Sequence, residues 1–311
     1  MVDQAVMEHV ALVVGESLVD VVRGRDGSVR EHPGGSAANA AVALARLGRP
    51  VRFVTAYADD DRGRLLAAHL GDNAVAPGSD PFVLDRTATA MATLAESGAA
   101  TYEFDIEWRF APPDLPADVV PVVVVFGSIG AALDPGASEV AGLLERHRAS
   151  ALTVFDLNAR PAITGTGAEV VARAEAMGAL AAVVKASDED FDQLWPGRDH
   201  ADVAAGFLAR GSGAVVLTRG EAGLRWFTAT GRGDVPAVRA VVADTIGAGD
   251  TVTAAIVDAL WGLGVVGPAS REGLRSLRAE DWTSVLEHAG RAAAITVSRP
   301  GGDPPWRHEL G

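Results

Sequence analysis

The sequence predicts an α/β protein in which one mostly parallel sheet lies between two layers of helices, a three-layer α/β/α arrangement. Three observations lead to this fold class. Short runs of apolar, β-branched residues recur along the 311 residues, Ala-rich stretches of helical length separate them, and most of the runs are apolar throughout. Continuous apolar strands that alternate with helices are typical of a parallel sheet buried on both faces.

Six runs are predicted to be strands because each is short and rich in Val, Ile, Leu or Phe. They are Val10–Val14, Val51–Thr55, Val120–Phe126, Ala151–Phe155, Ala181–Val184 and Ala214–Thr218. Eight stretches rich in good helix formers are predicted to cover the sheet. They are Ser36–Leu47, Gly63–Leu70, Ser138–His147, Glu169–Met177, Asp188–Leu194, Ala201–Ala209, Gly249–Leu263 and Ser284–Val297. We expect a single domain over residues 1–311, with Gly267–Glu280 as a polar connection between helices.

Two segments break this alternation. Ser17–Glu31 is predicted to be a hairpin that turns at Arg25-Asp26-Gly27, and Pro81–Ile106 holds alternating strands around Glu96-Ser97-Gly98. Neither segment has a helix between its strands. We therefore expect the two to pair into a small antiparallel sheet, a lid formed by about residues 17–33 and 81–110. The alternative is a pair of edge hairpins without a function.

The composition excludes several classes of function. Lys and Arg number 27 against 41 Asp and Glu, so the formal net charge is −14. Nucleic acids and anionic membranes bind basic surfaces, so neither is an expected partner. The chain has no cysteine, which excludes disulfides, thiolate zinc sites and Cys nucleophiles and fits a cytoplasmic protein. No apolar run approaches the ~20 residues that span a membrane.

A glycine-rich turn that leads into an apolar helix is the strongest functional signal. It reads Asp244-Thr245-Ile246-Gly247-Ala248-Gly249-Asp250. Small residues at 247–249 let a phosphate approach the free N–H groups at the start of a helix. A carboxylate at Asp250 would repel a phosphate that is merely bound, whereas a general base beside a transferring phosphoryl group explains it. The alternative is that Asp250 only caps the helix.

A second signal is a pair of glycines before a helix of small residues, in the segment Pro33–Ala43. Gly34 and Gly35 let the backbone approach a ligand closely. The Asn39 side chain has both a donor and an acceptor, which suits a sugar hydroxyl. The alternative is a tight turn in which Ser36 caps the helix.

Together these two motifs resemble the paired signatures of the ribokinase/PfkB family of carbohydrate kinases, and the resemblance covers nearly the whole chain. It implies a ribokinase-like fold with a small β-sheet lid over the sugar. It also implies transfer of the γ-phosphate of ATP to a hydroxymethyl group.

The resemblance assigns roles by position. Asp250 is similar to the catalytic base, and the amides of Gly247, Ala248 and Gly249 resemble the anion hole. The positions that hold the sugar in relatives are Asp20, Gly34, Gly35 and Asn39. The nucleotide loop corresponds to Thr218, Gly220 and Gly223, with Gly249 beside it. A potassium ion in relatives lies at positions that match Asp244, Ile246, Thr296, Arg299 and Gly301.

Two further segments resemble the fructokinase branch, which includes 2-keto-3-deoxygluconate kinases. Asp156–Pro161 matches its D-x-N-x-R-P pattern, which places Arg160 near the sugar and the phosphates; the alternative is an arginine paired with a neighbouring carboxylate. Lys185–Asp190 lies where many relatives carry N-x-x-E, which organises magnesium waters. Here Lys185 and Ser187 are expected near the nucleotide and Asp190 near the magnesium. Gly290 falls where relatives often have Asn or His near adenine.

The lid segment carries the expectations about the sugar. Trp108 is expected to stack on it, the alternative being that Trp108 packs under the lid. Tyr102–Phe110 lacks the tyrosine–arginine pattern of a 2-keto-3-deoxygluconate kinase. Arg109 is the one residue of this segment that could bind the carboxylate of such a substrate.

We therefore expect a magnesium-dependent ATP:sugar kinase that is most like a fructokinase. Potassium dependence and a homodimer through the lid are further expectations. The alternatives are a 2-keto-3-deoxygluconate kinase, a ribokinase, a nucleoside kinase, or an inactive homologue that only binds sugar or nucleotide.

Overall fold

The main sheet contains the six predicted parallel strands and three more, namely β5, β12 and β13. In residues 7–24, 27–94 and 100–311, which the computed structural model describes, its order is β13-β12-β11-β10-β9-β8-β1-β4-β5. Seven strands are parallel: β1 (Glu8–Val14), β4 (Val51–Val54), β5 (Val75–Pro77), β8 (Val119–Gly127), β9 (Leu152–Asp156), β10 (Val183–Ser187) and β11 (Ala214–Thr218). This confirms the predicted fold class.

The antiparallel strands β12 (Leu224–Thr228) and β13 (Gly231–Val235) at one edge were not predicted. Gly231–Val235 reads GRGDV and carries almost no apolar signal. The strand forms because β12 pairs along the whole of β11 and leaves its other edge open to β13.

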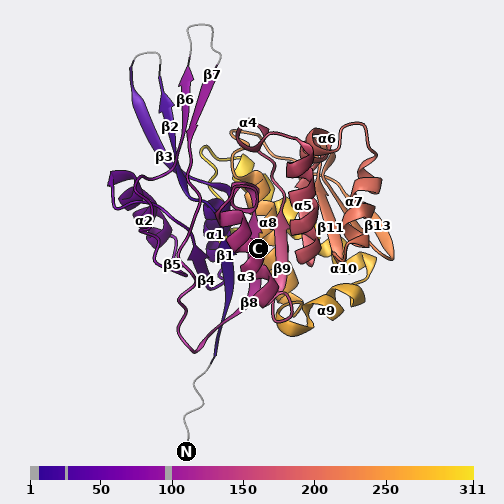
Figure 1. The fold of residues 1–311 in the computed structure, drawn as a ribbon. Helices are drawn as coiled ribbons and strands as arrows, with labels where there is room; N and C mark the ends of the chain where they lie inside the picture. The colour runs from indigo at the N-terminus through magenta and orange to yellow at the C-terminus, as the bar shows by residue number, and fades with distance from the viewer. Residues whose placement is uncertain (1–6, 25–26, 95–99) are drawn as a thin grey trace, which may run out of the picture.

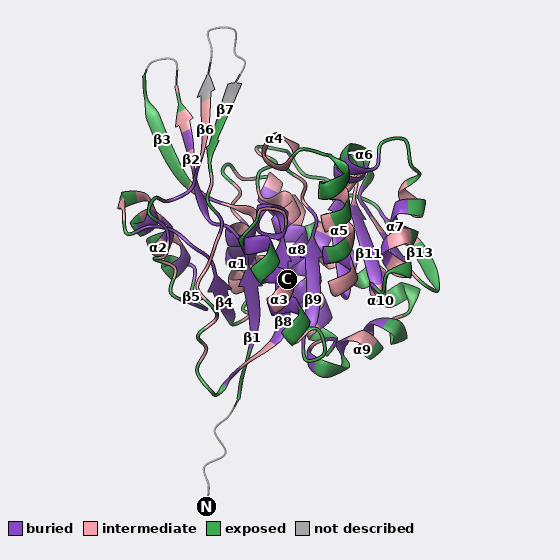
Figure 2. Ribbon diagram, in the orientation of Figure 1, coloured by how far each residue is buried: buried purple, intermediate pink, exposed green. Residues whose placement is uncertain are grey.

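Helices cover both faces of this sheet (Figure 1). Successive side chains of a strand point to opposite faces, so Ala11 and Val13 of β1 join one buried cluster while Leu12 and Val14 join the other. The first face carries α1 (Ser36–Arg46), α2 (Asp61–Asp72), α8 (Ala248–Gly262) and α10 (Ala279–Val297). The second carries α3 (Gly136–His147), α5 (Ala168–Leu180), α6 (Asp188–Leu194) and α7 (His200–Ala209). The central strands are accordingly buried along most of their length (Figure 2).

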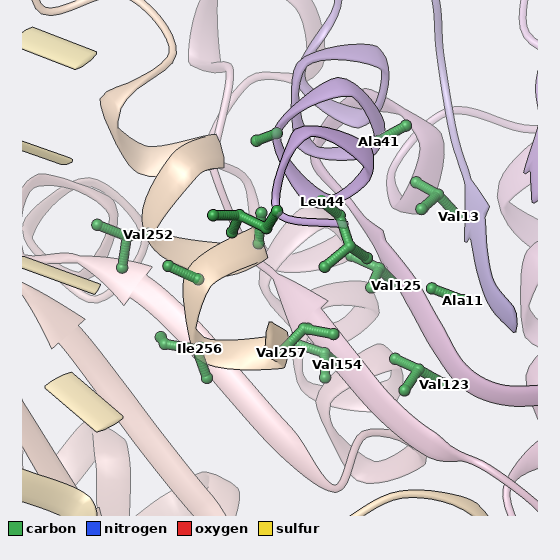
Figure 3. Packing of buried hydrophobic residues seen from close by; sticks show 14 of the residues in the cluster. Ala11, Val13, Ala41, Leu44, Val123, Val125, Val154, Val252, Ile256 and Val257 are labelled. Atoms are coloured by element: carbon green, nitrogen blue, oxygen red, sulfur yellow. The ribbon is translucent and has the colours of Figure 1, made fainter. Parts of the chain in front are cut away.

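The packing of α1 against α8 positions the site described below. Figure 3 shows Leu44 of α1 next to Val125 of the sheet, with Val257 of α8 next to Val154; all belong to one buried cluster. Burying a Val, Leu or Ile side chain contributes about 1.5–3 kcal/mol, and the small residues of α1 let the two helices approach closely. Their N-terminal ends are thereby held next to each other.

A smaller sheet projects from one corner of the molecule (Figure 1). Its order is β3 (Val29–Gly34), β2 (Leu18–Arg23), β6 (Thr89–Leu94) and β7 (Ala100–Asp105). The expectation of a purely antiparallel sheet was wrong, because β2 and β6 pair in parallel between the two hairpins. Both strands leave the main body in the same direction, which makes their pairing parallel. The turn residues Arg25, Asp26 and Glu96-Ser97-Gly98 lie outside the described residues.

Two helical segments differ from expectation. The connection Gly267–Glu280 holds a 3-10 turn (Gly267–Ala269) and α9 (Ser270–Ser276), and α10 begins at Ala279 instead of Ser284. One further short helix, α4 (Pro161–Thr164), follows β9. Within the described ranges, no single helix is long and apolar enough to cross a membrane, although α8 and Gly267–Ser276, bent by 102°, pass that test as a pair.

Candidate active site

The candidate residues gather beyond the carboxyl ends of neighbouring parallel strands. Glu16 follows β1, Asn158 follows β9, Ser187 ends β10 and Thr218 ends β11. The carboxyl ends of parallel strands meet at one edge of a sheet, which is where open α/β folds bind ligands. The N-termini of α1 and α8 face the same edge and complete the site.

Asp250 is the centre of this arrangement. It is the third residue of α8, which begins after Gly247 in the left-handed region (φ 73°), and only 7% of its surface is exposed. One carboxylate oxygen, Oδ1, accepts a hydrogen bond from Oγ of Ser36 at 2.6 Å, and Oδ2 accepts one from Nδ2 of Asn39 at 2.9 Å. The helix has no side-chain cap, so the view that Asp250 only caps the helix was wrong.

Ser36 was expected, at most, to cap α1. Gly35 holds the cap position instead, without a side-chain bond, and Ser36 turns its hydroxyl to Asp250. Nδ2 of Asn158 donates to the same Oγ at 2.7 Å, while Oδ1 of Asn158 accepts from Arg160 at 2.6 Å. An amide nitrogen can only donate, so the Ser36 hydroxyl hydrogen points to Asp250. This contact joins residues 214 positions apart, and no local pattern signals it.

Glu16 is a second residue that sequence reasoning left without a role. Its side chain is 3% exposed and accepts the N–H groups of Ser36 and Gly130, both at 3.0 Å. Burial raises the pKa of Glu16 to about 7, against the opposing effect of these N–H groups and of Arg160. The carboxyl group therefore ties the end of β1 to the start of α1.

Replacing Glu16 by Gln should change how stability depends on pH. The folded protein holds the Glu16 proton up to about pH 7, whereas the unfolded chain releases it near the ordinary pKa of 4.5. The stability that this proton contributes is fully present below about pH 4.5 and is lost, by about 3 kcal/mol, as the pH rises to about 7. Denaturant unfolding across this window measures it. Parallel stability curves for wild type and Glu16→Gln would contradict the assignment.

Of the expected sugar-binding residues, Asn39 contacts Asp250 directly, and Asp20, Gly34 and Gly35 lie where β2 and β3 meet the start of α1. Asp20 of β2 packs against Gly34, where an added Cβ would lie 2.2 Å from Oδ2 of Asp20. Gly35 adopts φ 102°, and a Cβ there would lie 2.7 Å from the carbonyl oxygen of Glu16. Burial raises the pKa of Asp20, with His32 and Arg160 opposing. Both glycines are thus required for the close approach of β3 and α1 to this site.

Arg160 is exposed at the mouth of the site. Its guanidinium donates to Asn158 Oδ1 at 2.6 Å and to the carbonyl oxygen of Ala159 at 2.9 Å. In the described part of the chain it forms no ion pair with a carboxylate, so the paired alternative is not what the structure shows. Its positive charge remains available to an anionic ligand.

Trp108 does not face a ligand, which corrects the expectation that it stacks on the sugar. Only 2% of its surface is exposed, and its indole Nε1 donates to the carbonyl oxygen of Gly130 at 2.9 Å. Its ring lies 5.3 Å from that of Phe110 and packs directly on Gly136. The alternative was right that Trp108 is buried, but its described contacts, with Gly130, Gly136 and Phe110, belong to the core of the main body.

Trp108→Phe tests this structural role. The substitution leaves the buried carbonyl of Gly130 without its donor, so stability should fall by about 1–3 kcal/mol while the KM for sugar stays unchanged. Thermal unfolding and steady-state kinetics measure the two effects. As a control, Trp306→Phe alters a tryptophan that is 41% exposed and should cost less. A raised KM with unchanged stability would restore the stacking role.

Lys185 and Asp156 form a buried ion pair below the first turn of α8. Nζ lies 3.0 and 3.2 Å from the two carboxylate oxygens, and Thr253 also donates to Asp156 at 2.6 Å. A Cβ on Gly249 would lie 2.9 Å from Nζ. Burial alone lowers the pKa of Lys185, but the carboxylates of Asp156, Asp190 and Asp250 outweigh it and raise the pKa. Lys185 thus places a positive charge beside the expected anion hole, and direct contact with nucleotide stays a prediction.

Asp190 has a structural role that its sequence position did not reveal. It forms a capping box with Ser187 at the start of α6, and its Oδ1 accepts the N–H of Ala159 at 2.8 Å. Asp190 thereby fixes the loop that carries Asn158 and Arg160. Contact with magnesium waters stays a prediction.

The expected nucleotide loop is a tight turn between β11 and β12. Gly220 (φ 50°) and Gly223 (φ 84°) both lie in the left-handed region, and a Cβ on Gly223 would lie 2.2 Å from the carbonyl oxygen of Val235. Thr218 ends β11 just before this turn. Across the site, Ala248 donates its N–H to the carbonyl of Thr245 at 3.3 Å. A phosphate at this helix end would take over that donor.

The structure brings together part of the expected potassium set. The carboxylate of Asp244 accepts the N–H groups of Ile246 and Gly301, both at 3.0 Å. Thr296 instead directs its hydroxyl to Thr251, and Arg299 pairs with Glu309. Among the described residues, no group of three His, Asp or Glu side chains is placed to hold a metal ion.

Comparison with known families agrees with this geometry. The profile of the pfkB family of carbohydrate kinases matches residues 1–309. The chain belongs to the pfkB family. It is accordingly a carbohydrate kinase, a phosphotransferase that acts on sugars.

Relatives of this pfkB kinase include fructokinases. A fructokinase of Rhizobium leguminosarum bv. trifolii is 34% identical over 261 residues, which cover 80% of this chain and 79% of the relative. An aminoimidazole riboside kinase of Salmonella typhimurium is 31% identical over 245 residues, 76% of either chain. The crystal structure of a fructokinase with bound ATP from Xylella fastidiosa superposes with a TM-score of 0.84 at 25% identity, covering 98% and 97% of the two chains. The expectation of a fructokinase-like sugar kinase is confirmed.

Proposed function

We propose that this pfkB kinase transfers the γ-phosphoryl group of ATP to the hydroxymethyl oxygen of a neutral ketose such as fructose, with Asp250 as general base. The observation that carries the proposal is the position of the Asp250 carboxylate. It lies at the glycine-rich N-terminus of α8, and hydroxyl and amide donors already occupy both of its oxygens. A base for phosphoryl transfer needs this juxtaposition of carboxylate and anion cradle.

Each residue around Asp250 has a proposed role in the transfer. The acceptor hydroxyl donates to Oδ1 of Asp250 in place of Ser36, and Asn39 holds the carboxylate at Oδ2. Asp20 and the glycine pair orient the remaining hydroxyls of the sugar. As the acceptor oxygen attacks phosphorus, its proton passes to Asp250. The N–H groups at the start of α8, the nearby Lys185 ammonium and Arg160 stabilise the charge that is spread over the phosphoryl oxygens.

ATP is the proposed phosphoryl donor. Small residues at 247–249 leave the helix N-terminus open to a phosphate, and the turn at Gly220 and Gly223 gives the nucleotide a backbone surface to lie on. Mg²⁺ supplies charge neutralisation for the phosphates when it is bound. Potassium dependence is proposed from the turn in which Asp244 joins Ile246 and Gly301.

A neutral sugar suits the arginines of the site. The one arginine that favoured a 2-keto acid, Arg109, is paired with Glu107 at 2.7 Å. Arg160 has no carboxylate ion-pair partner in the described ranges, and in this proposal it pairs with the phosphates and not with a substrate carboxylate. Fructose is therefore preferred over 2-keto-3-deoxygluconate.

The test is ATP consumption with Mg²⁺ and K⁺ across fructose, 2-keto-3-deoxygluconate, ribose, tagatose, inositol and adenosine. Turnover is expected on fructose, and it should be lost in Asp250→Asn. Preferential turnover of the keto acid or of a nucleoside would show that this compound, and not fructose, is the substrate. ATP binding without turnover on any of them would leave an inactive binding homologue.

A homodimer through the small sheet is also proposed, because β3 presents a largely exposed face. Sedimentation velocity is expected to show a dimer. Val29 on β3 is 55% exposed, and Val29→Asp should convert the dimer to a monomer. A monomeric wild type at micromolar concentration would contradict the proposal. The cytoplasmic location stays a prediction.

A further inference from the structure

Ser36 occupies the position that an acceptor hydroxyl takes on a general base. Its Oγ donates to Oδ1 of Asp250 at 2.6 Å and accepts from Asn158 at 2.7 Å. Asn39 orients the other oxygen of the base. A hydroxyl within hydrogen-bond reach of a carboxylate, itself oriented by a third group, is the arrangement of an activated nucleophile.

Several contacts hold Ser36 in this position. Asn158 adopts φ 37°, in the left-handed region, and its carbonyl oxygen accepts from Oγ of Ser128 at 3.2 Å. Such conformations persist where surrounding contacts enforce them, often at functional sites. Glu16 holds the backbone N–H of Ser36. The hydroxyl is thus fixed on Asp250 from the end of β1 and from the loop after β9.

The charges around Ser36 favour a phosphoryl group. Ser36 begins α1 and Asp250 lies in the first turn of α8, so the positive ends of two helix dipoles meet here. Arg160 is one hydrogen bond from Asn158 and carries no carboxylate partner in the described ranges. A phosphate on a side chain at a helix N-terminus is stabilised by the helix and by a nearby arginine.

We propose that Ser36 is an internal phosphoryl acceptor, and that the kinase phosphorylates it when ATP is bound without sugar. The proposal rests on the proposed function, because it uses the same base and the same donor. Oγ of Ser36 forms a bond to the γ-phosphorus, and the bond from that phosphorus to the bridging oxygen of ATP breaks. ADP leaves with the electron pair of the broken bond. The hydroxyl proton passes to Asp250 and then to solvent.

A bound sugar competes with this reaction, because its hydroxymethyl group takes the place of Ser36 on Oδ1 of Asp250. Once formed, phosphoserine has no hydroxyl to donate to the base, and its charge occupies the acceptor position. Sugar kinase activity should therefore decline in proportion to the phosphoserine that accumulates. The amount of phosphoserine should therefore increase with the time that the kinase spends with ATP and without sugar.

The full chain is incubated with ATP and Mg²⁺ and without sugar, then digested with trypsin. Cleavage after Arg30 and Arg46 releases the peptide Glu31–Arg46, in which Ser36 is the one Ser, Thr or Tyr. Mass spectrometry should find this peptide heavier by one phosphoryl group, less so when fructose is present. The label should be absent from Ser36→Ala and Asp250→Asn. Ser276→Ala, on α9 at the far end of the molecule (Figure 1), should be labelled as wild type is.

The outcomes separate this proposal from the function on which it rests. Sugar turnover without phosphate on Glu31–Arg46 overturns the internal acceptor and leaves the sugar kinase intact. Phosphate that persists in Asp250→Asn also overturns it, since the base would not be involved. Neither phosphate nor turnover on any sugar overturns both. The wild-type peptide map needs no variant, and thermal unfolding shows whether each variant is folded.

Discussion

Asp250→Asn should lower kcat by a factor of about 10²–10⁴, the usual span of general-base catalysis. The amide keeps the shape of the side chain and a hydrogen-bond acceptor for one of the two donors, Ser36 and Asn39, but it cannot take a proton from the sugar. The phosphate cradle belongs to the backbone of α8 and remains. ATP affinity, measured by calorimetry, should therefore stay close to that of wild type while steady-state turnover collapses.

Asp202→Asn is the matched control for this experiment. Asp202 is the third residue of α7, as Asp250 is of α8, but it is exposed and remote from the glycine-rich turn. It should leave kcat unchanged. Near-wild-type turnover in Asp250→Asn, or an equal loss in both variants, would refute the role of Asp250 as base.

The second large effect is expected from Lys185→Met. The substitution leaves the carboxylate of Asp156 buried with Thr253 as its remaining side-chain donor. Breaking a buried ion pair from one side costs about 3–5 kcal/mol, because one charge stays without compensation. The free energy of unfolding by denaturant should fall by that amount. Turnover should fall as well, because the ammonium beside Gly249 is lost.

Two controls isolate the ion pair. Lys185→Met combined with Asp156→Leu removes both charges and should cost less than the sum of the single variants. Arg148→Met breaks an exposed pair with Glu145, whose N···O distance is 3.2 Å, and should cost less than about 1 kcal/mol. Equal losses of stability in Lys185→Met and Arg148→Met would show that the buried pair contributes no more to the free energy of unfolding than the exposed one.

The sequence was sufficient for most of the main sheet and for the centre of the site. Apolar runs such as Val120–Phe126 have one reasonable interpretation, and glycines before a helix indicate a place where a ligand meets the backbone. Asp250 and Asn39 could be named because their motifs are local. The strand Gly231–Val235 could not be predicted, because it is a strand through its pairing with β12 and not through its own composition.

Long-range packing decided the residues that sequence reasoning missed. Ser36 meets Asp250 only because α1 and α8 pack side by side, and Glu16 joins Gly130 across 114 positions. Trp108 was misjudged for the same reason. A tryptophan in a segment expected to lie over the sugar suggests stacking, but its indole N–H donates to a backbone carbonyl in the core. Residue type and spacing carry no information about such partners.

Gly35 alone separates the end of β3 at Gly34 from the start of α1 at Ser36. A rotation of the small sheet therefore has a one-residue joint through which to act, and Ser36 lies immediately beyond that joint, in contact with the base. A movement of the small sheet is thus transmitted through Gly35 to Ser36 and its contact with Asp250. Under the proposed function, closing the small sheet over the sugar and positioning Asp250 as proton acceptor would be coupled through Gly35. A stiffer residue at this position should therefore change sugar affinity and turnover together.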